Sequence, residues 1–147
     1  MLNEARIFLN ADFNAEFSHH YGVLEFPNAG ATIIDCVNRE YCKKLIVQLP
    51  GQHHPAHYRR KKDETFQVLY GVVEMEVEGR RRTLQPGDTQ VVQQGVWHES
   101  WTESGAILEE ISTTHYSDDS FYEDKQINQM DRSLRKTVVK HWGRYQF

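Results

Sequence analysis

Short alternating runs of apolar and polar residues follow one another along the middle of the chain. The clearest run covers residues 72–78, where valine and methionine at positions 73, 75 and 77 alternate with glutamate at positions 74, 76 and 78. A period of two residues is typical of a β-strand with one buried face and one solvated face. This run therefore predicts a strand with its apolar side on the core.

Other strand-like runs occur at short intervals and are separated by turn residues such as Gly71, Gly79 and the pair Pro86-Gly87. Many short strands with turns at roughly 8–12 residue spacing favour a β-sandwich or barrel. We therefore expect an all-β domain, a barrel over residues 31–115. The further runs cover residues 31–37, 44–49, 65–70, 82–85, 89–93, 96–101 and 106–112.

The two ends of the chain lack this pattern. Residues 1–30 are rich in aromatic residues and predict an N-terminal arm that packs on the barrel or on a partner. Residues 116–147 begin acidic, end basic and form a C-terminal extension. The aromatic arm and a modest hydrophobic share of 39% suggest apolar surface buried between subunits, so we expect a homodimer.

Length and charge narrow the class of protein. A chain of 147 residues suits one domain, and a net charge of −4 argues against nucleic acid or an anionic membrane as the main partner. No apolar run reaches the length of a membrane span, and residues 1–6 do not resemble a signal peptide. Cys36 and Cys42 form no metal or redox pattern, which indicates reduced thiols in the cytoplasm.

Two histidines and one carboxylate on strand-like segments are the candidate metal ligands. His57 and Glu64 flank a predicted turn, and His98 comes from a distant predicted strand. Imidazole and carboxylate together suit Zn²⁺, Mn²⁺, Fe²⁺, Ni²⁺ or Co²⁺, and a barrel interior would let them converge. The alternative from spacing alone is that both histidines are ordinary polar residues lining the barrel without metal.

These residues resemble the cupin superfamily. Its first motif, Gly-x5-His-x-His-x3–4-Glu-x6-Gly, is matched by Gly51, His57, Glu64 and Gly71. Its second motif, Gly-x5-Pro-x-Gly-x2-His-x3-Asn, is matched in part. The matching positions there are Gly87, Gly95 and His98, with Gln93 in place of proline and Thr102 in place of asparagine.

The resemblance covers roughly residues 40–112 and implies a double-stranded β-helix, that is, a jelly-roll barrel. The stretches 61–71 and 109–116 are similar to small cupin modules of sugar and sialic-acid-type metabolism, including D-lyxose isomerase-like proteins. The resemblance therefore implies a divalent metal ion as cofactor and a sugar as ligand.

The chain departs from the family pattern at Arg59, which stands where the second histidine is expected. A guanidinium stays protonated and does not ligate metals. Three arrangements remain open: the three remaining ligands hold the ion, His53 or His54 completes the set, or Arg59 occupies a metal-free site.

Strand parity places Arg59 on the same face as His57, so its planar fork is expected to face the cavity and bind a carboxylate or phosphate. The alternative is an ion pair with Glu64. His54 and Trp97 are further candidates for sugar binding. The basic runs 60–62 and 80–82 are expected to be solvated turns.

Glu109 and Glu110 are adjacent in a predicted strand, so alternation turns one of them inward. The inward carboxylate could serve as a general base with its pKa raised by burial, or could pair with Arg59. Alternation alone does not decide whether Glu109 or Glu110 faces inward.

Three functions remain open from the sequence. The first is metal-assisted isomerisation or epimerisation of a sugar or acidic sugar derivative. The second is a non-catalytic module that binds a sugar or stabilises a partner enzyme, and the loss of one histidine favours it. The third, Fe²⁺-dependent oxygenation, uses the same ligands.

Overall fold

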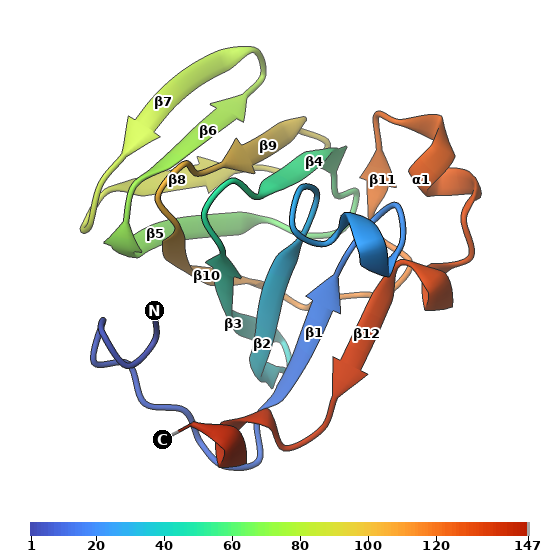
Figure 1. Ribbon diagram of the computed structural model, residues 1–147. Coiled ribbons are helices and arrows are strands. Elements are labelled where there is room, and N and C mark those ends of the chain that lie inside the picture. The colour runs from blue at the N-terminus through green and yellow to red at the C-terminus, as the bar shows by residue number, and fades with distance from the viewer. Residues whose placement is uncertain (147) are drawn as a thin grey trace.

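Two antiparallel β-sheets face each other in the computed structural model, which describes residues 1–146 (Figure 1). The larger sheet has the strand order β12-β1-β2-β3-β10-β5-β8, and the smaller has the order β11-β4-β9-β6-β7. This arrangement confirms the predicted all-β jelly-roll barrel. The strands of the larger sheet are β1 (Asn14–Ser18), β2 (Ala31–Asn38), β3 (Tyr41–Gln48), β5 (Glu64–Gly71), β8 (Thr89–Val92), β10 (Ala106–Thr113) and β12 (Lys136–Val139). Those of the smaller sheet are β4 (His53–Tyr58), β6 (Val73–Val77), β7 (Arg80–Leu84), β9 (His98–Trp101) and β11 (Phe121–Tyr122).

Helical segments are few and short, and they lie outside the barrel strands. The α-helix α1 (Lys125–Gln129) begins after Asp124, whose side chain accepts a hydrogen bond from the Gln126 N–H. The 3₁₀ turns are η1 (Val23–Glu25), η2 (Arg132–Leu134) and η3 (Trp142–Tyr145). No helix among residues 1–146 is long and apolar enough to cross a membrane.

The larger sheet is buried on both faces, as neighbours in β10 illustrate. Leu108 packs between the two sheets with Phe66 and Met75, whereas Ile107 packs on the outer face. The outer face is covered by the N-terminal arm and by Trp142. Because successive residues of a strand point to opposite faces, two consecutive apolar residues can both be buried here.

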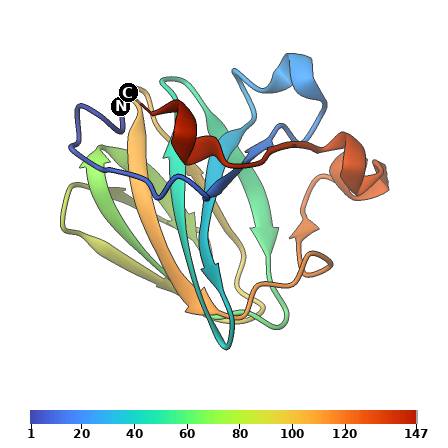
Figure 2. The ribbon, with the colours of Figure 1, turned by 90° about the horizontal axis from the view of Figure 1, so that it is seen from below.

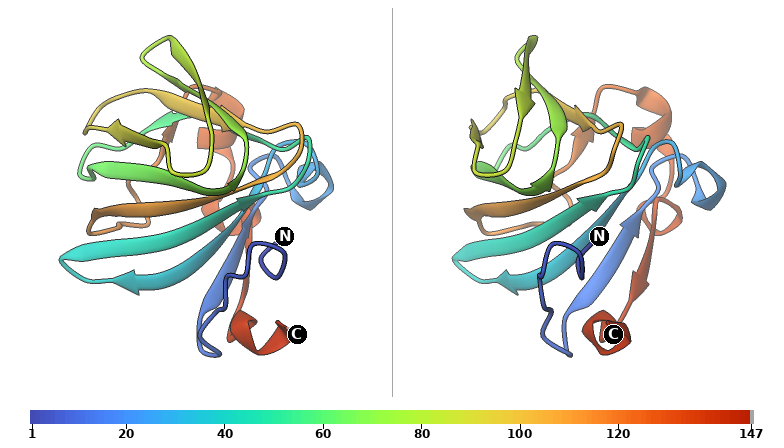
Figure 3. Two further views of the ribbon diagram at one scale, coloured as in Figure 1. Left: turned by 90° about the vertical axis from the view of Figure 1, so that its left-hand side faces the viewer. Right: turned by 60° about the vertical axis from the view of Figure 1, so that its left-hand side comes forward.

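The N-terminal arm packs on its own barrel, which is one of the two placements expected for it. The first residues of the chain cross the outer face of the larger sheet and lie beside the C-terminal segment (Figures 2 and 3). The Leu9 N–H donates to the side chain of Gln146 at 2.9 Å, which ties the two ends together. The homodimer stays a prediction.

Both sheets extend beyond residues 31–115. β1 lies in the N-terminal arm and pairs with β2 on one side and with β12 on the other. β11, from the C-terminal extension, pairs with β4 and brings Tyr122 opposite His57. The extension therefore forms part of the wall next to the metal-ligand candidates.

Gly71 is required where β5 turns into β6. Its φ of 74° lies in the left-handed region, and a Cβ placed there would lie 2.1 Å from the carbonyl oxygen of Gly105. The last glycine of the first cupin motif therefore lets two backbone segments approach closely at the end of the barrel.

Candidate functional site

The barrel holds a cavity between the two sheets. Apolar residues such as Phe66, Met75 and Leu108 form part of its wall, and a group of polar residues forms the rest. The polar residues include His54, His57, Arg59, Glu64, Ser100 and Glu110.

His57 lines this cavity, and His98 lies beside His57 because β4 and β9 pair with these residues in register. Their ring centroids are 4.2 Å apart. His57 Nδ1 lies 2.8 Å from the Pro55 carbonyl, and His98 Nδ1 lies 3.1 Å from the Val96 carbonyl. Each Nδ1–H can donate to its carbonyl, which leaves each Nε2 lone pair available to a metal ion.

Glu64 meets these histidines from the opposite sheet. Its Oε2 lies 3.4 Å from His98 Nε2, and neither buried atom has a hydrogen-bond partner. Burial holds the pKa of His57 well below its usual value. Burial also lowers the pKa of His98, although the Glu64 carboxylate opposes this effect. Both imidazoles are therefore neutral at pH 7, the form that binds metals.

The donor chemistry fits a divalent metal ion. Two ligands of a tetrahedral ion, with bonds of about 2.1 Å, stand about 3.4 Å apart. Glu64 Oε2 and His98 Nε2 have this separation. Within residues 1–146, however, no group of three or more His, Cys, Asp or Glu side chains is already arranged to hold a metal ion. A bound ion would therefore require the His57 side chain to move into place as the third ligand.

Arg59 lines the cavity, on the face that strand parity predicts. Its Nε lies 3.7 Å from Glu64 Oε1, and its Nη1 donates to the Ser120 hydroxyl and to the Asp119 carbonyl. Nε itself is buried without a hydrogen-bond partner. The guanidinium is thus held by the C-terminal extension, with one N–H still able to donate to a ligand.

Lys62 corrects the expectation that residues 60–62 form a solvated turn. Its side chain is 1% exposed, its Nζ lies 3.4 Å from Glu64 Oε1, and it pairs closely with Glu110. Lys62 stands two positions before Glu64, so alternation places both on the inner face. That parity was the signal that could have identified Lys62 from the sequence.

β10 turns Glu110 into the cavity and Glu109 out of it. Glu110 is 3% exposed and also accepts a hydrogen bond from the Ser112 hydroxyl. Glu109 lies on the other face of the sheet and pairs with Lys43 at 2.6 Å. Of the two candidate bases, only Glu110 can therefore reach a ligand in the barrel.

The expectation of a raised pKa for Glu110 was wrong. Burial alone raises the pKa of this carboxyl, but the charges of Lys62, Lys44 and Arg59 and the Lys62 hydrogen bond outweigh burial and lower it. Glu110 is therefore a carboxylate at pH 7, and these cations make it a weaker base than an unpaired buried carboxylate.

His54 and Trp97 occupy different places. The His54 ring lines the cavity, with its centroid 4.7 Å from that of His57. Trp97 is 42% exposed, packs against Tyr58 and borders a surface pocket beside the barrel that His98 also lines. The structure therefore places His54 in the barrel cavity and Trp97 outside it.

Comparison with known proteins agrees with this architecture. The model of the cupin domain family matches residues 44–112, which contain both predicted motifs. Together with the fold, this match identifies residues 44–112 as a cupin domain.

Among curated proteins, the D-lyxose/D-mannose isomerase of Thermosediminibacter oceani is 26% identical over 141 residues. The match covers 75% of this chain and 77% of that protein. Among solved structures, the L-ribose isomerase of Cellulomonas parahominis with L-psicose has a TM-score of 0.71 at 14% identity and covers 87% of this chain and 88% of its own. The L-ribose isomerase of Acinetobacter sp. DL28 in complex with L-ribose has a TM-score of 0.70 at 13% identity, with 91% and 90% covered. At such identities the structural matches establish the fold.

Proposed function

We propose that this chain binds a sugar in the barrel cavity and interconverts its aldose and ketose forms with a divalent metal ion as cofactor. The observation that carries the proposal is the convergence of three buried polar atoms without hydrogen-bond partners: Glu64 Oε2, His98 Nε2 and Arg59 Nε. Buried polar groups are normally satisfied, so such a convergence indicates a missing ligand. The similarity to proteins named as sugar isomerases supports the choice of reaction.

His57, Glu64 and His98 would hold the ion. When bound, a divalent ion supplies Lewis-acid polarisation of the sugar carbonyl and the neighbouring hydroxyl. The neutral state of both imidazoles and the free Nε2 of His98 support this role. Which of the suitable divalent ions is bound is a matter for elemental analysis.

Glu110 is the proposed base. Its carboxylate accepts the proton from C2 of the aldose and returns it to C1, while the hydroxyl proton on O2 passes to O1. The sugar therefore keeps its composition, and Glu110 ends in its starting state. Lys62 orients this carboxylate and keeps it charged. The free Nε–H of Arg59 donates to an oxygen of the bound sugar, most strongly to an anionic one.

The positive charges near Glu64 favour sugar binding without turnover. Arg59 and Lys62 both lie near Glu64 Oε1, at 3.7 Å and 3.4 Å, and their positive charges oppose a divalent cation at the same carboxylate. A weak metal site would leave a cupin that recognises a sugar, or stabilises a partner, without converting it.

An isomerase assay separates the two functions. Purified protein is incubated with D-lyxose, D-mannose or L-ribose, each free and as its phosphate ester, after supplementation with Mn²⁺, Co²⁺, Ni²⁺, Fe²⁺ or Zn²⁺, and products are separated by chromatography. The proposal predicts ketose formation that a chelator abolishes and the metal restores. Saturable sugar binding in calorimetry with no ketose under any of these metals would establish the binding module instead.

A further inference from the structure

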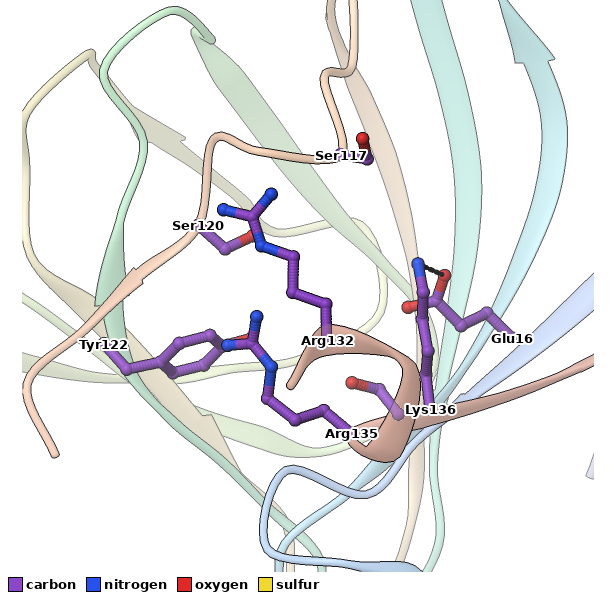
Figure 4. Close-up of a pocket in the computed structure, with 8 residues that line it drawn as sticks. Glu16, Ser117, Ser120, Tyr122, Arg132, Arg135 and Lys136 are labelled. Atoms are coloured by element: carbon purple, nitrogen blue, oxygen red, sulfur yellow. Dashed lines mark hydrogen bonds and ion pairs between the residues drawn. The ribbon is translucent and has the colours of Figure 1, made fainter. Parts of the chain in front are cut away.

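A second concave pocket lies outside the barrel, where the C-terminal extension crosses the end of β1 (Figure 4). Its wall carries three cationic side chains and several hydroxyl groups. The cations are those of Arg132, Arg135 and Lys136, and the hydroxyls include those of Ser117, Ser120 and Tyr122.

The turn η2 places the two arginines on the same side. Residues three apart eclipse each other in a 3₁₀ turn, so Arg132 and Arg135 project in one direction. Asp131 caps this turn by accepting from the Ser133 N–H at 2.8 Å and from its hydroxyl at 2.6 Å. The His19 N–H donates to the Arg135 carbonyl at 2.9 Å and fixes the turn to the end of β1.

The charges of this pocket are unbalanced. Lys136 pairs with Glu16 at 2.9 Å, so the charges of these two side chains offset each other. Within the described residues 1–146, neither Arg132 nor Arg135 forms an ion pair with a carboxylate, and in Figure 4 both guanidinium groups point into the space beside Ser120 and Tyr122. Two neighbouring guanidinium groups repel each other, and a bound anion would relieve this repulsion.

Only one layer of side chains separates this pocket from the barrel cavity. The Tyr122 ring lies 5.4 Å from the His57 ring on one side, and Arg135 Cζ lies 5.7 Å from the Tyr122 centroid on the other. The Ser120 hydroxyl accepts a hydrogen bond from Arg59, which itself lines the cavity. The two pockets therefore share one wall, and a ligand that spans both would have to pass between Arg59 and Tyr122.

We propose that this pocket, built by Arg132 and Arg135, binds a phosphate monoester, and that the sugar substrate is a sugar phosphate. The second part rests on the proposed function. A phosphate offers three acceptor oxygens and close to two negative charges, which match two guanidinium forks and the surrounding hydroxyls. A carboxylate has a single bidentate edge and would satisfy one arginine.

Calorimetry with three matched sugars tests this assignment. D-mannose, D-mannuronate and D-mannose 6-phosphate differ at C6 alone, and inorganic phosphate serves as a fourth probe. Wild type is compared with the variant R132Q/R135Q and with R39Q/R80Q, which removes the same charge from exposed positions elsewhere. Thermal unfolding of each variant checks that the fold is kept.

We expect wild type to bind the phosphate ester at least tenfold more tightly than mannose, and more tightly than mannuronate. In R132Q/R135Q this preference should be lost, whereas R39Q/R80Q should keep it. Equal binding of all three sugars by wild type would overturn the inference and leave the proposed function intact. Arginine-dependent binding of inorganic phosphate without binding of any sugar would uphold the anion site and overturn the proposed function.

Discussion

The barrel cavity and the pocket formed by η2 differ in how their charges are used. In the cavity, the cations of Arg59 and Lys62 are buried and lie against Glu64 and Glu110. In the outer pocket, the guanidinium groups of two arginines face an open space without carboxylate partners among residues 1–146.

This difference predicts which substitutions should lower the stability of the fold. Buried charges depend on one another, because removing one partner leaves the other uncompensated in a medium of low dielectric constant. Exposed cations are solvated, so their loss should affect ligand binding and leave stability almost unchanged. Chemistry is therefore expected inside the barrel and recognition of an anion outside it.

The largest effect is expected at Glu110. If Glu110 is the base, the variant Glu110→Gln should reduce the kcat of isomerisation by about 10²–10⁴-fold, because an amide cannot accept the proton. The matched control is Glu109→Gln, which makes the same change on the other face of β10. Steady-state kinetics measures both. Equal losses in the two variants would rule out a special role for the inner face.

Lys62 should be the most important single cation for folding. Lys62→Met leaves Glu64 and Glu110 without a common partner and should lower the free energy of unfolding by about 3–5 kcal/mol. Arg132→Gln, in the outer pocket, should change it by less than about 0.5 kcal/mol. Urea denaturation measures both values. A loss below about 1 kcal/mol for Lys62→Met would contradict the contrast between the two regions.

His20 should make stability depend on pH. Burial lowers the pKa of His20 from 6.5 to about 4. The hydrogen bond to the Ala29 carbonyl opposes this shift, and the charge of Arg135 adds to it. The unfolded chain therefore takes up this proton first as the pH falls. The corresponding stability is complete above pH 6.5 and is lost between pH 6.5 and 4, at a cost of about 3 kcal/mol.

The variant His20→Asn tests this pH dependence, because asparagine tolerates the left-handed backbone at this position. His141→Asn is the control, since His141 has a left-handed backbone but an exposed side chain. Unfolding free energies at pH 7 and pH 4 should differ less in His20→Asn than in wild type or the control. Identical pH dependence in all three proteins would argue against this role of His20.

A smaller effect is expected when Arg59 is changed. Arg59→His adds an imidazole and removes a cation 3.7 Å from Glu64, so metal binding should tighten by about tenfold. Arg59→Ala removes the cation without adding a ligand, and should weaken binding of acidic sugars while sparing neutral ones. Calorimetric titration of metal and sugar measures both. Unchanged affinities for metal and sugar in both variants would mean that Arg59 is a structural ion-pair partner and does not bind the ligand.

The barrel and its strand faces could be predicted from the sequence because they depend on local alternation. In β6, Val73 and Met75 are buried while Glu74 and Glu76 are partly exposed, as their spacing indicates. The same parity placed Arg59 correctly on the cavity side. It could not choose between Glu109 and Glu110, because one step of register exchanges the two faces.

The features that the sequence did not predict depend on contacts between distant segments. Lys62 lies in a charged stretch of sequence, and its parity with Glu64 indicates the inner face but not its partner Glu110, which is 48 residues away. β12 joins β1 across more than a hundred residues, so the outer pocket has no local signature beyond two arginines three positions apart. Trp97 flanks His98 in sequence but packs on Tyr58, because adjacent residues of the chain do not share a face.

Metal content tests the central claim most directly. Wild type and His98→Ala are purified after expression in medium supplemented with Mn²⁺, Fe²⁺, Co²⁺, Ni²⁺ or Zn²⁺, and each is analysed for bound metal. We predict about one ion per wild-type chain, because His57, Glu64 and His98 would form one three-ligand site, and strong depletion in His98→Ala. If both proteins are free of metal under every condition, the three residues do not form a metal site and the isomerase proposal is wrong.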